Sequence, residues 1–400
     1  MSWEKGINVN NVSTIICGSK VFLGVGAIEK MDFIAEQLKA KGVTSVIAVT
    51  GKAAYKSTGA WGYVTKALDK HGIKYTLYDK VQPNPETQQV DEAVKIARDA
   101  GAQAVIAIGG GSPIDAGKSV AILLEYPEYT CQDLYEAKLP AEKAVPIITI
   151  NLTHGTGTEV NRFAVVTIPE KEYKPAIAFD CIYPLYSIND PALMTGLPAN
   201  QTAYVSVDAL NHVIEAASTV LNNPFSITLS KEVIALVAKY LPVALKTPDD
   251  LEARYFLTYA AMIAGTSFDN GLLHFTHALE HPLSGIKSEI THGLGLAVLL
   301  PAVVKAIYHE KSEILADILA PIVPGLSGAA DEGQKAADGV YKWLSSVGVP
   351  EKLGDLGFTK ADVPKLVQLA FETPGLDGLL GCAPTANDKA AVEKIYNDSF

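Results

Sequence analysis

Four of the chain's eight histidines fall within nineteen positions, inside the segment 271–295 (GLLHFTHALEHPLSGIKSEITHGLG). Two of them, His277 and His281, are four residues apart, and Asp208 and His212 repeat this spacing upstream. Residues four apart on an α-helix project from the same face. Two such helices facing each other would bring a carboxylate and several imidazoles together. These are ligand types that divalent transition metals accept.

His292, in the motif THGLG, completes the candidate set. We expect its neighbouring glycines to loosen a loop there, so that one carboxylate and three nitrogens surround an ion. A single histidine on an apolar helix is usually a hydrogen-bonded core residue, but two pairs followed by a third position favour a metal. His274, which shares the His277 face, is interpreted as a residue behind the ligands or as a pocket wall, and His71 and His309 as solvent-facing.

The composition points to a small-molecule enzyme. The net charge of -11 and the pI of about 5.3 disfavour a nucleic-acid or an anionic-membrane partner, because either needs a basic surface. No run of eighteen apolar residues occurs, and the start of the chain, MSWEKGINVN, lacks the pattern of a targeting segment. The cysteines are scattered, which is typical of reduced thiols, so we expect a cytoplasmic protein.

The pattern of apolar residues divides the chain into two domains, 1–195 and 196–400, joined at a proline-rich connector. In the first, short β-branched runs alternate with helical patterns, which predicts a Rossmann-like parallel sheet. In the second, every periodic segment is helical, which predicts an all-α domain. The expected strands are 44–51, 73–81, 103–109 and 144–153.

Gly109, Gly110, Gly111 and Ser112 follow an apolar strand and precede a helix. Glycines let the backbone approach a ligand, and the free N–H groups of a helix N-terminus bind phosphate, so this turn indicates a nucleotide pyrophosphate site. The loop 152–160, LTHGTGTEV, lies at another strand end and suits the second half of a dinucleotide. Asp115 would serve local turn and cap chemistry, with a cofactor role as the alternative.

Together these motifs resemble the iron-containing, or group III, alcohol dehydrogenases, which are related to glycerol dehydrogenase and dehydroquinate synthase. The resemblance covers nearly the whole chain. It rests on GVGA at 24–27, PNP at 83–85, GGGSPID at 109–115, HGTGTEV at 154–160, DALNH at 208–212, HALEHPLSG at 277–285 and THG at 291–293.

The resemblance implies a dinucleotide-binding α/β domain, a helical metal domain of the dehydroquinate synthase-like fold, a cleft between them, and a homodimer or higher homo-oligomer. His281 would line the site, and the proton of the alcohol would pass through His281, as the catalytic residue, or through water. The implied metal ligands are Asp208, His212, His277 and His292. The implied cofactor contacts are Asn84, Gly109, Gly110, Gly111, Ser112, Thr153 and Thr158.

The chain departs from the family at several positions. His154 and His274 replace smaller residues, which is expected to change the polarity of the pocket and the substrate preference. In NAD-preferring members the strand before the first helix ends in an acidic residue that repels a 2′-phosphate. Here Gly51 and Lys52 end that strand. We therefore expect NADP(H) to be used at least as well as NAD(H).

The expected reaction is hydride transfer between a small primary alcohol or aldehyde and a nicotinamide dinucleotide, assisted by Fe²⁺ or, alternatively, Zn²⁺. One alternative is polyol oxidation of the glycerol dehydrogenase type. A second is a dehydroquinate synthase-like lyase, which is disfavoured because Lys287 is the only basic residue in the segments around the histidines. A third, a non-catalytic nucleotide sensor, would not keep a complete ligand set.

Overall fold

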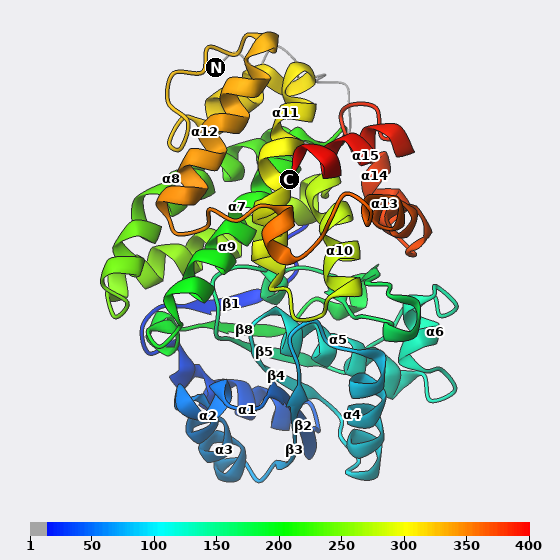
Figure 1. The fold of residues 1–400 in the computed structure, drawn as a ribbon. Helices are drawn as coiled ribbons and strands as arrows, with labels where there is room; N and C mark the ends of the chain where they lie inside the picture. The colour runs from blue at the N-terminus through cyan, green and yellow to red at the C-terminus, as the bar shows by residue number, and fades with distance from the viewer. Residues whose placement is uncertain (1–13) are drawn as a thin grey trace.

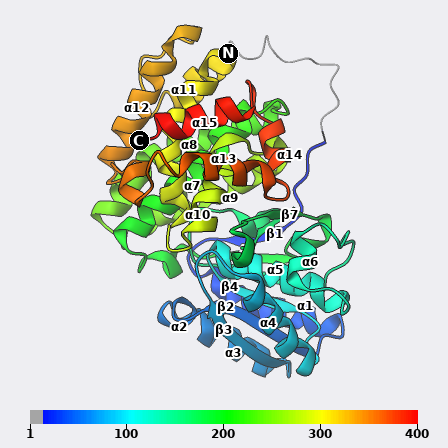
Figure 2. The same ribbon diagram turned by 45° about the vertical axis from the view of Figure 1, so that its right-hand side comes forward.

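The computed structural model describes residues 14–400. The start of the chain, 1–13, on which the prediction about targeting rests, lies outside the described residues. In Figure 1 the first half of the chain forms a sheet with its helices at the bottom, and the second half forms a helical layer above it. The view in Figure 2 shows the same two layers in contact through the loops at the upper edge of the sheet.

The six-stranded sheet is parallel throughout and has the order β1-β8-β5-β4-β2-β3. The predicted parallel sheet is confirmed. β2 is flanked by β3 on one side and by β4 on the other, so the order in which strands are added to the sheet reverses between β2 and β4. The strands are β1 Lys20–Leu23, β2 Ser45–Gly51, β3 Lys74–Val81, β4 Val105–Gly109, β5 Ile147–Asn151 and β8 Tyr186–Asn189.

Successive side chains of a strand alternate between two apolar cores. In β4, Val105 packs into the core beneath α4, α5 and α6, whereas Ile106 packs into the core beneath α1 and α3. Burial on both faces explains why these strands are continuous apolar runs in the sequence. The helices of this layer are α1 Met31–Ala40, α2 Ala54–Ser57, α3 Ala60–Lys70, α4 Thr87–Asp99, α5 Gly111–Glu125 and α6 Cys131–Tyr135.

Four strands were not predicted from the sequence: β1, β8 and the antiparallel pair β6 Phe163–Val165 and β7 Ala176–Ala178. β8 is fully buried, but its apolar pattern is interrupted by Ser187 and Asn189. Both are satisfied internally, since Ser187 donates to the carbonyl of Glu159 and Asn189 donates to the Glu159 carboxylate. Buried polar side chains that have partners hide a strand from pattern reading.

The helical layer has one large apolar core, to which α11 contributes buried residues from Ala297 to Tyr308. By length and composition α11 is able to cross a membrane, but 67% of its most apolar window is buried in the protein. The short α14 and α15 were not predicted. The helices are α7 Ala199–Ser218, α8 Pro224–Lys246, α9 Leu251–Gly271, α10 Phe275–Ile286, α11 His292–Leu319, α12 Gly333–Ser346, α13 Val363–Glu372, α14 Leu376–Gly381 and α15 Lys389–Asp398.

The expectation that the glycines after His292 loosen a loop is wrong. His292 is the first residue of α11, and the glycines lie inside this helix. A Cβ on Gly293 would lie 2.1 Å from the carbonyl oxygen of Tyr204, and one on Gly295 would lie 2.7 Å from Cγ of Glu280. These glycines are needed because α11 packs closely against α7 and α10.

Candidate active site

Three helices bring the four predicted ligands together. Asp208 and His212 come from α7, His277 from α10, and His292 from the first turn of α11. From Oδ1 of Asp208, the Nε2 atoms lie 3.5 Å away in His212, 3.7 Å in His277 and 4.0 Å in His292. These separations exceed a hydrogen bond and match roughly 3.4 Å, the edge of a tetrahedron of ligands with bonds of about 2.1 Å.

Two of these atoms are buried and have no hydrogen-bond partner: Oδ1 of Asp208 and Nε2 of His277. Leaving such groups unpaired inside a protein costs free energy. The rings of His212 and His277 are stacked, with centroids 4.6 Å apart, so neither ring satisfies the other. A cation between the four side chains would satisfy the unpaired atoms, and the residues therefore fit a metal ion.

Glu215, one turn beyond His212 on α7, orients the His277 ring. One of its carboxylate oxygens pairs with Nδ1 of His277. The other accepts backbone N–H groups of His274 at 3.0 Å, Thr276 at 2.8 Å and His277 at 3.4 Å, and so caps the first turn of α10. The sequence analysis missed Glu215, although its spacing of i+7 from Asp208 places it on the same helix face.

Glu280 orients the ring of His292 in the same way. Its carboxylate pairs with Nδ1 of His292 and with the buried ammonium of Lys174, which lies 3.3 Å from Oε2. Lys174 also donates to Ser284 at 2.8 Å. Glu280, His281 and His292 form a second cluster of ligand-type atoms, but Lys174 already supplies the positive charge there, so this cluster does not fit a second metal ion.

The carboxylate–histidine pairs set the charges of the site. Burial raises the pKa of Asp208, but the surrounding imidazoles outweigh it and lower the pKa to about 2. Burial lowers the pKa of His277, but the Glu215 charge outweighs it and raises the pKa to about 9. Burial lowers the pKa of His212 to about 3. Without an ion the cluster thus holds an ionised Asp208, a neutral His212 and a protonated His277, and a bound ion would have to displace the His277 proton.

His281 lies beside the cluster and lines the cavity, with its ring centroid 5.7 Å from that of His292. Burial, and then the charge of Lys174, lower its pKa well below the ordinary range, so the ring is neutral. Its Nδ1 is buried without a partner. The next residue, Pro282, does not end the helix: α10 continues through it to Ile286, although a proline removes one hydrogen bond of the helix.

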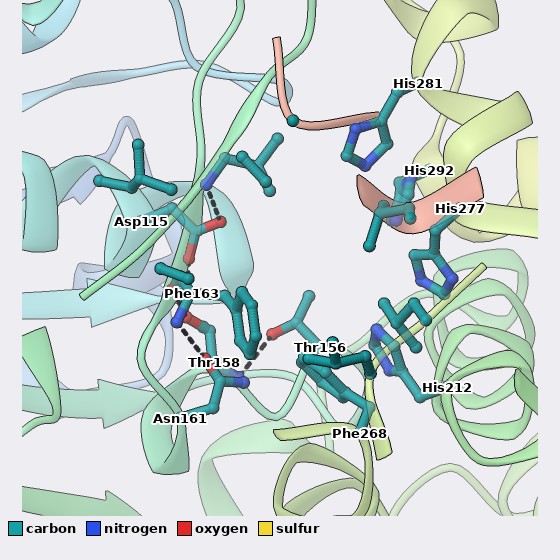
Figure 3. Close-up of a pocket in the computed structure, with 18 of the residues that line it drawn as sticks. Asp115, Thr156, Thr158, Asn161, Phe163, His212, Phe268, His277, His281 and His292 are labelled. Atoms are coloured by element: carbon teal, nitrogen blue, oxygen red, sulfur yellow. Dashed lines mark hydrogen bonds between the residues drawn. The ribbon is translucent and has the colours of Figure 1, made fainter. Parts of the chain in front are cut away.

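A cavity of about 290 Å³ opens next to the cluster. Figure 3 shows His212, His277, His281 and His292 on one side of it and Asp115, Thr158 and Asn161 on the other. Apart from these polar groups most of the wall is apolar, which favours a substrate with a hydrocarbon part. The larger apolar side chains of the wall are Phe163, Val165, Ile177, Phe268, Leu272, Leu273 and Leu379.

Asp115 is not a helix cap, contrary to the sequence interpretation. Its carboxylate accepts hydrogen bonds from Oγ1 of Thr158 at 2.7 Å and from the backbone N–H of Val165 at 3.0 Å. Burial raises its pKa to about 6. Lys118, one turn further on α5, donates to Thr158 at 2.9 Å and to carbonyls around Asn161. This buried network fixes the loop that carries Thr158 at the cavity wall.

The glycine turn lies where the sequence predicts, at the end of β4 and the start of α5. Gly110 precedes α5 and no side chain caps this helix, so its first N–H groups stay available to an anion. A Cβ on Gly110 would lie 2.8 Å from Cγ2 of Thr153, and one on Gly111 would lie 2.6 Å from Cγ2 of Thr156. Because Thr156 also lines the cavity, the glycine turn adjoins the cavity beside Asp208 and the histidines.

The other predicted cofactor contacts lie at the carboxyl edge of the same sheet. Gly51 is the last residue of β2 and is followed by Lys52. The carboxyl ends of β2 and β4 flank the point where the strand order reverses, and open parallel sheets bind ligands at this point. Asn84 differs, because its amide donates to the carbonyls of Ser288 at 2.8 Å and Ile290 at 3.1 Å, and so ties the sheet to the segment before α11.

His154 and His274 do not change the polarity of the pocket, because neither lines the cavity. His154 is buried and pairs with Nη1 of Arg254 at 2.9 Å. His274 is buried against Ser218, at 2.9 Å. His71 is also less exposed than predicted, since it contacts a carboxylate of α1. His274 thus lies behind His277, beside Glu215, which agrees with one of the two positions interpreted from the sequence. The pocket role of His154 and the exposure of His71 were predicted wrongly, because the sequence does not show which polar partners the fold supplies.

The basic residues around the histidines also differ from the sequence estimate. Lys174 comes from the segment between β6 and β7, far along the chain, and reaches within 3.4 Å of Nδ1 of His292. Lys287 instead donates to the carbonyls of Leu356 and Gly357. Since Lys174 is neutralised by Glu280, it adds no free positive charge for a polyanionic substrate. The lyase alternative therefore gains no support.

Comparison with known proteins places this arrangement. Residues 18–191 match the family model "iron-containing alcohol dehydrogenase", and residues 202–400 match the model of the C-terminal part of the same family. A long-chain primary alcohol dehydrogenase of Thermoanaerobacter ethanolicus is 57% identical over the whole of both chains. A 1,3-propanediol dehydrogenase of Klebsiella pneumoniae is 32% identical, over 95% of this chain and 96% of that protein.

Solved structures agree in fold. An NADH-dependent butanol dehydrogenase of Thermotoga maritima superposes with a TM-score of 0.88 at 30% identity, covering 97% of this chain and 98% of that one. A 1,3-propanediol oxidoreductase superposes with a TM-score of 0.87 at 30% identity, covering 98% and 100% of the two chains. The similarity therefore extends over both the sheet layer and the helical layer.

Proposed function

This chain belongs to the iron-containing alcohol dehydrogenase family and is a metal-dependent alcohol oxidoreductase, and on that premise we propose that the cluster around Asp208 holds one Fe²⁺ ion. The observation that carries the proposal is the pair of buried, unpartnered atoms, Oδ1 of Asp208 and Nε2 of His277, which face each other at 3.7 Å. The proposed ligands are Asp208, His212, His277 and His292.

The choice of ion follows from the donors. Three imidazole nitrogens and one carboxylate oxygen, without a thiolate, form a borderline ligand set that suits Fe²⁺ and Zn²⁺ alike. Family membership favours iron, and Zn²⁺ is the alternative. Glu215 and Glu280 hold the Nδ1 protons of His277 and His292, so that each ring presents a free Nε2.

When bound, the ion acts as a Lewis acid on the substrate oxygen, and a nicotinamide ring takes up or returns the hydride. The residues of the chain supply the surroundings. The apolar wall excludes water and holds the hydrocarbon part of the substrate. His281, neutral and beside the cluster, is proposed to pass the proton of the alcohol to or from solvent.

For the dinucleotide we propose a site along the carboxyl edge of the sheet. The free N–H groups at the start of α5, behind Gly110, would bind the pyrophosphate. The proposed contacts to the dinucleotide are Gly109, Gly110, Gly111, Ser112, Thr153 and Thr158. Asn84, which ties the sheet to the segment before α11, is a further proposed contact. NAD(H) use is supported by the relative that is named NADH-dependent. We propose NADP(H) use as well, because Gly51 brings no carboxylate against a 2′-phosphate and Lys52 follows it.

As substrates we propose primary alcohols and aldehydes with an alkyl chain. The wall around Phe163, Ile177 and Leu379 offers hydrocarbon contacts and few hydrogen bonds, which favours an alkyl group over a polyol. The name of the 57% identical relative, a long-chain primary alcohol dehydrogenase, agrees with this wall.

We further propose two domains divided at residue 195, between β8 and α7, a homodimer or higher oligomer, and a cytoplasmic location. The location is supported by the four cysteines, all free in the part of the chain that the structure describes.

The proposed function is tested by mixing anaerobic protein that has been loaded with Fe²⁺ with NADH or NADPH and with aldehydes of two to eight carbons. Cofactor oxidation that rises with chain length is expected. Activity only on dihydroxyacetone and other polyol ketones would show that the substrates are polyols and not alkyl alcohols. If NADH and NADPH are oxidised with none of these substrates, the proposed function is rejected.

A further inference from the structure

Leu272, which follows α9, has an unfavourable backbone conformation. Its φ is 61° and its ψ is -178°. Glu172, another non-glycine residue with positive φ, has ψ of 28° and so lies in the ordinary left-handed region. The conformation of Leu272 lies outside that region and is essentially restricted to glycine, because the Cβ of any other residue crowds the backbone.

The conformation is imposed by what surrounds the three-residue link, 272–274, between α9 and α10. On one side, Gly271 is pressed against α7, where a Cβ would lie 2.6 Å from the carbonyl oxygen of Ala216. On the other side, the backbone N–H of His274 is held by Glu215 at 3.0 Å. The chain must therefore turn sharply at Leu272 to place α10, and with it His277, against α7.

The side chain of Leu272 does not compensate for this strain by packing. Its neighbour Leu273 also lines the cavity, but it is 9% exposed and packs with Ala216 and Phe268 in an apolar cluster. Leu272 is only half-buried, lies in none of the apolar clusters of the described residues, and lines the cavity. Strained residues that persist without a packing gain concentrate at functional sites. A leucine where glycine would be relaxed points to a use for its side chain.

We propose that Leu272 is a specificity-determining residue, whose isobutyl group forms the part of the cavity wall that contacts the alkyl chain of the substrate. This inference rests on the proposed function, since it needs a substrate with a hydrocarbon part. The strained backbone places the side chain in the cavity next to Phe268 and the metal cluster, where a relaxed glycine would leave the wall open.

Two variants separate the wall from the strain. Leu272→Ala and Leu272→Gly both remove the isobutyl group, so both should lose about tenfold in kcat/KM for hexanol relative to ethanol, the scale of a lost hydrocarbon contact. Only glycine relaxes the backbone. Leu272→Gly should therefore melt at a higher temperature than Leu272→Ala, the reverse of the usual order, whether or not metal and cofactor are bound.

Val243, exposed and inside α8, gives the matched control. There alanine should be the more stable of the two replacements, as in any helix interior, and the preference for hexanol over ethanol should stay at the parent value. A hexanol-to-ethanol ratio that is unchanged in both Leu272 variants, with the parent active on both alcohols, would overturn the inference. An alanine variant that melts above the glycine variant at 272 would also overturn it, because the strain would then be absent.

The same experiment distinguishes this inference from the proposed function. If the parent protein oxidises no alkyl alcohol at all, the proposed function fails, and the specificity role of Leu272 fails with it. If the parent oxidises both alcohols and only the ratio fails to respond, the proposed function stands and Leu272 is not part of the specificity wall. The order of melting temperatures is measured in either case, because it requires no turnover.

Discussion

The carboxylate of Glu215 pairs with Nδ1 of His277 and at the same time accepts the backbone N–H groups at the start of α10. One buried side chain on α7 thus fixes both the position of α10 and the orientation of the imidazole that α10 carries. Because Nδ1 is engaged by Glu215, Nε2 is the atom directed at Asp208. The geometry of the four proposed metal ligands therefore depends on a residue that is not one of them.

Replacing Glu215 by Gln should weaken metal binding without unfolding the protein. A glutamine can still accept the N–H groups of α10, but its amide presents a donor to His277 and favours the ring with its proton on Nε2. Loss of such an outer carboxylate typically lowers metal affinity by about 10- to 100-fold. Competition with a coloured chelator measures the affinity.

Glu313, exposed on α11, supplies the control for this experiment. Glu313→Gln should bind metal like the parent. Parent-like affinity in Glu215→Gln would show that the pairing with His277 does not orient a ligand.

The buried pair of His154 and Arg254 should make stability depend on pH. Burial, and then the charge of Arg254, lower the pKa of His154 from its ordinary 6.5 to about 3. Below pH 6.5 the unfolded chain gains a proton at this position and the folded chain does not, so the free energy of unfolding falls as the pH falls. Between pH 6.5 and 5 this amounts to about 2 kcal/mol.

Urea unfolding at pH 7.5 and pH 5 tests this dependence. His154→Gln keeps an acceptor for Arg254 but cannot take up a proton, so its stability should fall less than that of the parent over this interval. His309→Gln, at an exposed position, should follow the parent. Identical losses of stability in His154→Gln and the parent would assign the pH dependence to other groups.

How far the sequence predicts this fold depends on how each residue is partnered. The sheet and the long helices were predicted because their apolar residues repeat with the period of their own element. β8 was missed because Ser187 and Asn189 are polar and buried, and the Glu159 groups that satisfy them come from elsewhere in the chain. Short-range patterns do not contain such tertiary partners.

The site shows the same limit. Helical spacing identified Asp208, His212 and His277, whereas His292 was identified from the motif THGLG and the family resemblance. Glu215 shares that spacing and could have been found. Lys174 carries no signal, because only the folded chain brings it to Glu280. The strain at Leu272 is likewise invisible in the sequence, because it arises from the way α9 and α10 are both pinned to α7.

Cofactor preference should follow the residue at the end of β2. A Cβ on Gly51 would lie 3.3 Å from the carbonyl oxygen of Val81, so a side chain fits there with a small adjustment. Gly51→Asp would place a carboxylate against a 2′-phosphate, and the ratio of kcat/KM for NADP(H) to that for NAD(H) should fall about tenfold or more. Lys52→Ala should lower the same ratio more weakly.

Steady-state kinetics with both cofactors measure these ratios, and the parent should use NADP(H) at least as well as NAD(H). A ratio in Gly51→Asp that equals the parent's would mean that the end of β2 does not select the cofactor.

His281 should affect turnover without affecting metal content. It lines the cavity, and the four proposed ligands are complete without it. His281→Ala should keep its iron and its affinity for the dinucleotide but lose about 10²-fold in kcat, the usual scale for a positioned proton donor or acceptor. Parent-like turnover would leave the proton to water, and depletion of iron would make His281 a ligand.

The metal content of His277→Ala tests the central claim most directly. Iron bound per chain and the rate of NAD(P)H oxidation are measured on the same sample, after loading with Fe²⁺ and removal of free metal, beside the parent and His309→Ala. If Asp208, His212, His277 and His292 share one ion, His277→Ala should lose the iron and the activity together, whereas the other two proteins keep both. A His277→Ala protein that is metal-free and fully active would contradict the account.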